Sequence, residues 1–126
     1  MANRCLLIVD DAKENTDLYR LMLKDDLPDL EIRCFNVFSA AEDFILAEHD
    51  RIAVALFDYI LDDGRLGYEL VERLKALGSS ASIILISGTL DAIPEEKKAM
   101  FDILLVKPVG SAELLQSIKE RVKMTV

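Results

Sequence analysis

Five polar residues in this sequence share one kind of position, because each follows a short apolar run. They are Asp10, Asp11, Asp58, Ser87 and Lys107. Three carboxylates that lie close together repel one another and need a cation to stay ionised. Oxygen ligands with room left for water suit Mg²⁺. These residue types therefore predict a magnesium site, provided that the fold brings the three acidic residues together.

The same residues suit phosphoryl transfer. An Asp such as Asp58 can attack phosphorus and form an acyl phosphate. Phosphoryl transfer depends mainly on positioning and on charge neutralisation. Mg²⁺ and Lys107 would neutralise the phosphoryl oxygens, and Ser87 would donate a hydrogen bond to one of them. Gly88, beside Ser87, would leave space for the phosphoryl donor.

Each of these residues also has an ordinary structural explanation. Asp11 could be a helix N-cap, Asp58 could begin a turn, and Lys107 could be a solvated lysine. The stretch Ser87-Gly88-Thr89 is an ordinary turn composition. Asp62-Asp63-Gly64 predicts a turn and lacks the remaining ligand spacing of a calcium loop. The joint placement of the residues after four different apolar runs is what favours a site.

The elements that must position these residues follow from hydrophobic patterning. Apolar runs rich in β-branched residues predict buried strands at 5–9, 32–38, 53–57, 83–86 and 103–106. Helical patterns lie between them, at 13–23, from 39, at 67–77, near 94–98 and from 111. Such alternation indicates an α/β fold with a parallel sheet covered on both faces. Functional groups in these folds gather at the carboxyl edge of the sheet, where the five polar residues would fall.

Local signals suggest where the helices begin and which faces they bury. Asp11 with Glu14, and Ser39 with Glu42, have the spacing of capping boxes. Leu18 and Leu21, together with Met22, are expected on the buried face of the first helix. Gly78 is expected to end the third helix.

Composition narrows the classes of function and location. The chain has 126 residues, 52% of them hydrophobic, and a net charge of −8. This size suits one domain, and the acidity disfavours direct binding to nucleic acid. No apolar run approaches the roughly 20 residues needed to cross a bilayer, and the N-terminus lacks a secretion signal. The protein is therefore expected in the cytoplasm, with Cys5 and Cys34 reduced and without a structural zinc site.

Four short motifs, in order, resemble those of receiver domains of two-component response regulators. They are Leu-Ile-Val-Asp10-Asp11, Leu-Phe-Asp58-Tyr-Ile-Leu, Ile-Ser87-Gly and Lys107-Pro108. The resemblance covers the whole chain, which is expected to be a single receiver domain, 1–126. It implies the flavodoxin-like doubly wound fold, a five-stranded parallel sheet with strand order 2-1-3-4-5.

The resemblance also assigns roles. Asp58 would be the phosphoacceptor. Asp11 would bind Mg²⁺ directly, Asp10 would help through water, and the backbone carbonyl of Ile60 would complete the protein ligands. Ser87 and Lys107 would hold the phosphoryl group, and the Lys107-Pro108 bond would be cis.

The resemblance implies two kinds of protein partner, a phosphoryl donor and an output protein. A histidine kinase or phosphotransfer protein would supply the phosphoryl group. The output would be a partner protein or a missing C-terminal output domain, because the chain ends soon after the fifth helix. No direct nucleic-acid or membrane partner is implied. Enzymatic activity would be limited to self-phosphorylation and self-dephosphorylation.

Three features depart from the family pattern. Leu104 stands where the family usually has a switch aromatic, which predicts that coupling between Ser87 and the output face is weaker or uses other groups. Asp62 replaces the usual Pro and would make the rim of the site more acidic. The segment from 87 to 107 is short, which predicts a short or irregular fourth helix.

Three other functions compete with that of a receiver. A hydrolase of the haloacid dehalogenase type needs a second Asp two residues after the nucleophile, where Ile60 stands. A flavin carrier would find Asp10 and Asp11 repelling its phosphate. A receiver-like module that binds partners without phosphorylation gains support from Leu104, whereas the complete acidic and basic set argues against it.

Overall fold

Strands and helices alternate along the chain in a computed structural model that describes residues 4–124. The strands are β1 Cys5–Val9, β2 Glu31–Phe35, β3 Ile52–Phe57, β4 Ser82–Ser87 and β5 Ile103–Val106. The helices are α1 Lys13–Leu23, α2 Phe38–Glu48, α3 Gly67–Ala76, α4 Glu95–Lys98 and α5 Ser111–Met124. All strand pairs are parallel, and the sheet order is β2-β1-β3-β4-β5. The predicted doubly wound α/β fold is confirmed.

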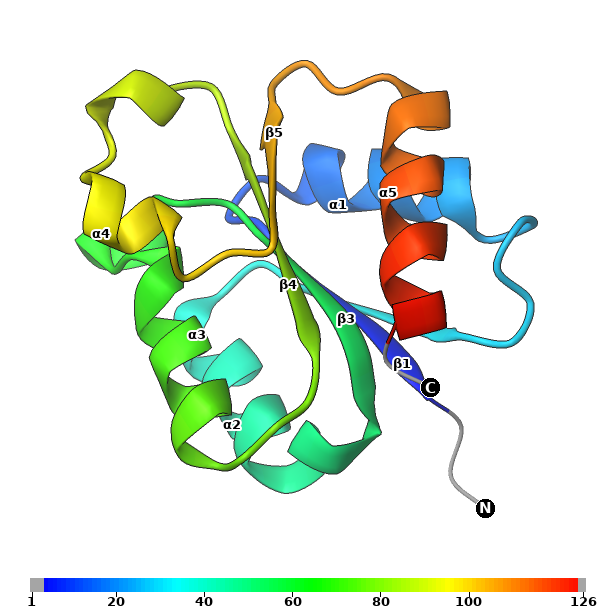
Figure 1. Cartoon of the computed structure of the whole chain (residues 1–126), viewed down its shortest axis with the longest axis horizontal. Coiled ribbons are helices and arrows are strands. Elements are labelled where there is room, and N and C mark those ends of the chain that lie inside the picture. Colours follow the sequence, from blue (N-terminus) through cyan, green and yellow to red (C-terminus); the bar gives the residue numbers. More distant parts are fainter. Residues whose placement is uncertain (1–3, 125–126) are drawn as a thin grey trace.

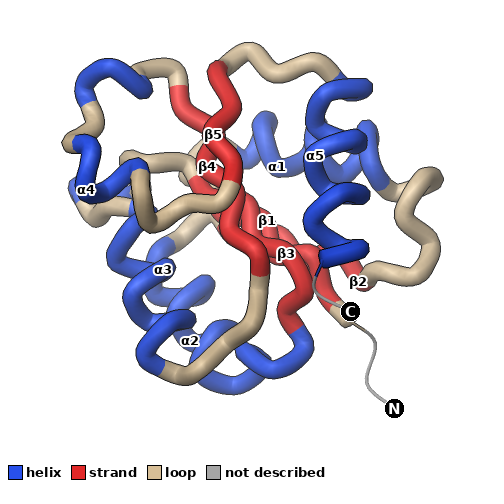
Figure 2. Tube along the Cα trace, viewed as in Figure 1, coloured by secondary structure: helices blue, strands red, loops and turns tan. Residues whose placement is uncertain are grey.

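Helices cover both faces of the sheet (Figures 1 and 2). On one face lie α1 and α5, and on the other lie α2, α3 and α4. Successive side chains of a strand point to opposite faces. Leu6 and Ile8 of β1 therefore pack into the core beneath α1 and α5, whereas Leu7 and Val9 pack into the core beneath α2 and α3.

The register of the central strands sets the position of the site. Val9, the last residue of β1, pairs with Phe35 on one side and with Phe57 on the other. The residue after β1, Asp10, donates its backbone N–H to the Phe35 carbonyl at 3.1 Å. Asp58, which follows Phe57, donates its backbone N–H to the Val9 carbonyl at 3.0 Å. These bonds fix Asp10 and Asp58 side by side at the carboxyl edge.

The second strand is shorter than its apolar run suggested. It ends at Phe35, and Phe38 is the first residue of α2, with its side chain buried. Phe38 belongs to the core beneath α2 and α3. An apolar run alone does not distinguish the end of a strand from the buried start of the next helix.

Neither predicted capping box forms. Ala12 is the N-cap of α1 and Val37 is that of α2, and neither side chain makes a capping hydrogen bond. Instead the Asp10 carboxylate accepts the Ala12 N–H at 2.9 Å, and the Asp62 carboxylate accepts the Phe38 N–H at 2.6 Å. The first turn of α2 is thus served by a residue from a distant loop.

The buried face of α1 differs from the prediction. Thr16, Tyr19 and Leu23 are buried, whereas Leu18 and Leu21 are 47% and 64% exposed. The buried set repeats at intervals of three and four residues, as a helix face requires. Leu18 and Leu21 are also helically spaced, but they lie on the face turned away from the sheet.

The fourth helix is short, as the length of its segment indicated. A single 3₁₀ turn, Leu90–Ala92, precedes the four residues of α4, and Pro94 stands just before the helix as its N-cap. The ammonium of Lys97 lies over the Tyr68 ring, 4.0 Å from the ring centre. The helix is therefore anchored to α3.

The start of α3 lies directly against the backbone of Asp58. The Gly67 N–H donates to the Tyr59 carbonyl at 2.6 Å. A Cβ at Gly67 would overlap the Asp58 carbonyl oxygen, so only glycine fits this approach. The other end of α3 is closed by Gly78 with φ +75°, as predicted.

Two further observations bear on the remaining predictions. Cys5 is buried and Cys34 half-buried, and both are free thiols. No helix in the described part of the chain combines the length and apolar character needed to span a membrane.

Candidate functional site

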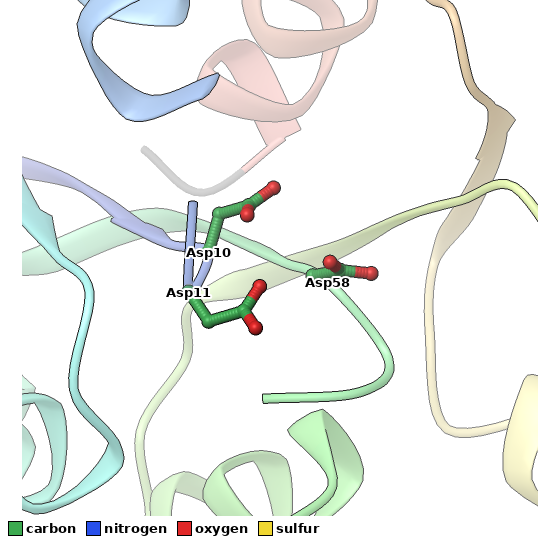
Figure 3. Close-up of side chains that lie close together, drawn as sticks. All are labelled: Asp10, Asp11 and Asp58. Atoms are coloured by element: carbon green, nitrogen blue, oxygen red, sulfur yellow. The ribbon is translucent and has the colours of Figure 1, made fainter. Parts of the chain in front are cut away.

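Three acidic side chains meet at the carboxyl edge of the sheet (Figure 3). Asp10 and Asp11 follow β1 and Asp58 follows β3, and one carboxylate oxygen from each lies within 4.8 Å of the others. Asp10 is 2% exposed, Asp58 is half-buried, and Asp11 is exposed. The cluster predicted from the sequence is therefore present in space.

Lys107 joins this cluster from the end of β5. Its ammonium donates to Asp10 Oδ2 at 3.1 Å and to Asp58 Oδ2 at 3.0 Å. Its backbone N–H donates to the Ser87 carbonyl at 3.0 Å, which places the end of β5 beside that of β4. The Lys107-Pro108 peptide bond is cis, as the resemblance implied.

Electrostatics at the site follow from burial and pairing. Burial raises the pKa of the Asp58 carboxyl above its ordinary value, although the hydrogen bond and charge of Lys107 oppose this shift. Burial also lowers the pKa of Lys107, but its hydrogen bond with Asp58 and the charges of Asp58 and Asp10 outweigh that effect. The pKa of Lys107 is therefore raised, and its side chain is protonated at neutral pH.

The donor set fits a hard divalent cation. With all groups ionised, three carboxylates face one ammonium, which leaves two negative charges uncompensated. Asp58 Oδ1 accepts the Tyr59 N–H at 2.8 Å, and the exposed Asp11 carboxylate leaves space for water. Oxygen ligands, excess negative charge and access to water together match Mg²⁺.

Ser87 and Ile60 are the other two predicted site residues. Ser87 is buried, and its Oγ accepts the Thr89 N–H at 3.0 Å and lies 3.4 Å from Thr89 Oγ1. The hydroxyl is thus held within its own turn, beside the Lys107 backbone. Ile60 forms an isolated antiparallel bridge with Leu66, and its side chain is 55% exposed.

Two asparagines that the sequence reasoning did not single out contact the cluster. Asn15 of α1 donates to Asp10 Oδ2 at 3.2 Å. Asn36, just after β2, donates to the Asp10 backbone carbonyl at 2.8 Å and to Thr16 Oγ1 at 3.0 Å. Ending the second strand at Phe35 would have placed Asn36 at the carboxyl edge, but nothing in the sequence marks Asn15.

A cleft opens beside the cluster, between α1 and the loop that follows β5. Its volume is about 370 Å³. It is lined by Asn15, Leu18, Tyr19, Lys107, Pro108 and Val109. Lys107 and Asn15 thus line the cleft and also contact the acidic cluster, Lys107 through Asp10 and Asp58 and Asn15 through Asp10.

The fold and this cluster agree with the family whose sequence model matches the chain. The model for the response regulator receiver domain matches residues 6–119. The chain belongs to this family, whose members are signalling domains of two-component systems. They typically bind Mg²⁺ at an acidic cluster and carry a phosphoaspartate.

Similar proteins cover nearly the whole chain. An uncharacterised 14.6 kDa protein of the sodA1 3′ region of Leptolyngbya boryana is 27% identical over 124 residues, which are 95% of this chain and 91% of that protein. A CheY-like receiver domain from Methanospirillum hungatei JF-1 is 25% identical, with a TM-score of 0.76 and 98% and 97% of the two chains covered. The receiver domain of a putative Luxo repressor from Vibrio parahaemolyticus is 21% identical, with a TM-score of 0.83 and coverage of 98% and 93%, and supports the fold.

Proposed function

We propose that residues 1–126 form one receiver domain that accepts a phosphoryl group on Asp58 from a phosphohistidine donor. The observation that carries this proposal is the position of Asp58, hydrogen-bonded to Lys107 and grouped with Asp10 and Asp11. Mg²⁺ would be held by Asp10, Asp11, Asp58 and the backbone carbonyl of Ile60. Bound there, it would supply positive charge to the phosphoryl oxygens.

The chain's own residues would carry the transfer as follows. A carboxylate oxygen of Asp58 forms a bond to phosphorus while the P–N bond of the phosphohistidine breaks. The electron pair of that bond returns to the donor imidazole. Lys107, already bonded to Asp58, neutralises a phosphoryl oxygen, and the Ser87 hydroxyl donates to another. The aspartyl phosphate then changes affinity for an output protein or a C-terminal output domain.

Exposed apolar residues support a protein as the phosphoryl donor. Leu18 and Leu21 of α1 are 47% and 64% exposed, and Leu18 lines the cleft that leads to Lys107. Apolar groups gathered on a surface mark interaction sites. A histidine kinase or phosphotransfer protein presenting an apolar helix face would suit this side of the domain. We place the protein in the cytoplasm, without direct nucleic-acid or membrane partners, consistent with its net charge of −8.

One observation favours a second candidate function. Leu104 of β5 is 39% exposed and carries no ring, so a phosphoryl group at Asp58 would lack the aromatic switch that the family usually has at this position. A binding module that works without phosphorylation would retain the fold and need no such switch. Hydrolase activity is not proposed, because apolar Ile60 occupies the place of the second acidic residue.

Intact-mass analysis tests the proposal. The protein is incubated with acetyl phosphate, with and without Mg²⁺, alongside Asp58→Asn. We expect one added phosphoryl group in the wild type, only with Mg²⁺, and none in the variant. If no adduct forms, and beryllofluoride also fails to bind, the phosphoacceptor role is rejected in favour of the phosphorylation-independent module.

A further inference from the structure

We propose that Asn36 is a positioning residue of the metal site, because its side chain holds the main chain of the acidic pair. This inference rests on the proposed magnesium site. Asn36 follows β2, the neighbour of β1, and its amide donates to the Asp10 carbonyl at 2.8 Å. The Asp10 N–H is bonded to the Phe35 carbonyl at 3.1 Å. Both backbone polar groups of Asp10 are therefore held by the end of β2.

The held carbonyl belongs to the peptide that joins the two acidic residues. A peptide unit is planar, so fixing the Asp10 carbonyl also fixes the Asp11 nitrogen. The direction in which the Asp11 side chain leaves the chain depends on that nitrogen. Asn36 thus sets the orientation of Asp11 through the backbone.

Asp11 needs this support more than Asp10 does. The Asp10 carboxylate is bonded to the Ala12 N–H, to Asn15 and to Lys107. The Asp11 carboxylate is exposed, and within the described residues it accepts no hydrogen bond. A metal-binding side chain that must become ordered when the cation binds lowers the affinity for that cation. Loss of the Asn36 bond would therefore weaken cation binding mainly through Asp11.

A second bond of Asn36 provides the control. Its amide also donates to Thr16 Oγ1 at 3.0 Å, and the Thr16 hydroxyl donates to the Lys13 carbonyl at 3.0 Å. Thr16 is 2% exposed. Thr16→Val removes this branch, which ties Asn36 to α1, and leaves the bond to Asp10 in place. The two substitutions separate a purely structural role of Asn36 from a role in orienting the acidic pair.

The experiment measures Mg²⁺ affinity by calorimetry and stability by urea unfolding in EDTA. It compares the wild type with Asn36→Leu and Thr16→Val. We expect both variants to lower the urea midpoint. Asn36→Leu should raise the Mg²⁺ dissociation constant about tenfold, as loss of a group that orients metal ligands does. Thr16→Val should change that constant less than about twofold.

Several outcomes would overturn the inference. A folded Asn36→Leu protein with wild-type Mg²⁺ affinity contradicts it, and so does an equal loss of affinity in both variants. If Asn36→Leu does not fold, Asn36→Ser replaces it and is judged by the same comparison with Thr16→Val. If the wild-type protein binds no Mg²⁺, the proposed metal site itself is wrong. This outcome is distinguishable from failure of the Asn36 inference, because it is seen in the wild type before any variant is compared.

Discussion

Lys107 is the cation that the described structure places on the acidic cluster, and it serves two carboxylates at once. Like charges at such short separations are costly when they are partly buried. Burial adds a larger cost: it raises the pKa of Asp58 because it disfavours the ionised carboxylate more than Lys107 favours it, and the charge of Asp10 adds to the rise. The ionised acidic residues of the site therefore destabilise the folded protein when no cation is bound.

Asp58→Asn should make the metal-free protein more stable at neutral pH, because it removes a buried carboxylate whose ionised form is disfavoured. The folded-state pKa of Asp58 is raised, so its ionised form destabilises the fold above the ordinary pKa range of a carboxyl. This cost disappears as the pH falls through the raised pKa, so the advantage of the variant should shrink as the solution is acidified. Urea unfolding in EDTA at several pH values measures it. A variant less stable than the wild type at neutral pH would contradict the prediction.

The buried thiol of Cys5 should make the folded protein less stable at alkaline pH. Burial raises the pKa of its thiol from 9.0 to about 11. The unfolded chain ionises this thiol first, so the stability it contributes is present below about pH 9 and lost as the pH rises towards about 11. Cys5→Ala should therefore lose less stability over this range, by on the order of 2–3 kcal/mol. Urea unfolding at several pH values measures the stability of the wild type and of Cys5→Ala. If the two stabilities fall equally as the pH rises, the buried thiol is not the cause.

At the scale of elements, the loop that follows Asp58 is tied to α2. The Asp62 carboxylate accepts the Phe38 N–H, and the Arg65 guanidinium lies 3.9 Å from the centre of the Phe38 ring. Arg65 also pairs with Glu69 of α3, and Glu69 accepts the Leu66 N–H at 2.7 Å. Asp62, which was expected to make the rim more acidic, also serves as the hydrogen-bond acceptor for the start of α2.

Asp62→Ala should destabilise the protein by about 1 kcal/mol, because the first N–H of α2 loses its acceptor. Asp62→Asn keeps an acceptor oxygen and should remain within about 0.5 kcal/mol of the wild type. Both free energies come from urea unfolding. Equal losses in the two variants would show that the negative charge matters and the hydrogen bond does not.

Gly67→Ala should destabilise the protein by about 2 kcal/mol or more, because its Cβ would press against the Asp58 carbonyl oxygen. The same change should slow phosphoryl uptake from acetyl phosphate, since α3 lies against the backbone of Asp58, the proposed phosphoacceptor. Gly110→Ala is a matched control, because a methyl group at Gly110 would meet no described atom within 4 Å beyond its chain neighbours. The prediction fails if both variants unfold at the same urea concentration.

At the scale of the whole molecule, the site lies on the strands that form the core. Every residue of β1 and β3 is buried, and Asp10 and Asp58 follow these two strands. Unfolding must therefore separate the three carboxylates. A cation that binds only the folded arrangement stabilises the entire domain.

Mg²⁺ should raise the unfolding temperature of the wild type. At a concentration about ten times its dissociation constant it should add about 1.4 kcal/mol of stability. Sodium chloride at the same ionic strength should have a much smaller effect, and Asp11→Asn should reduce the effect of Mg²⁺. Thermal unfolding followed by circular dichroism measures these shifts. An equal response to both salts would indicate general screening of the net charge of −8.

The sequence by itself determined the strands, their alternation with helices, and the gathering of Asp10, Asp58 and Lys107 at one edge. Burial on both faces of a parallel sheet requires continuous apolar runs, and these are visible locally. The polar residue that ends each run must then lie at the carboxyl edge. The acidic pair and the basic residue were predictable for this reason.

Only the tertiary structure decided which partners complete these elements. The start of α2 takes its acceptor from Asp62, 24 residues away, and the Asp10 carbonyl takes its donor from Asn36, 26 residues away. The side of α1 that is buried depends on how the helix lies on the sheet, which is why Leu18 and Leu21 face outwards. Hydrogen bonds and packing between distant segments leave no periodic signal in the sequence, because they arise only when the sheet order brings those segments together.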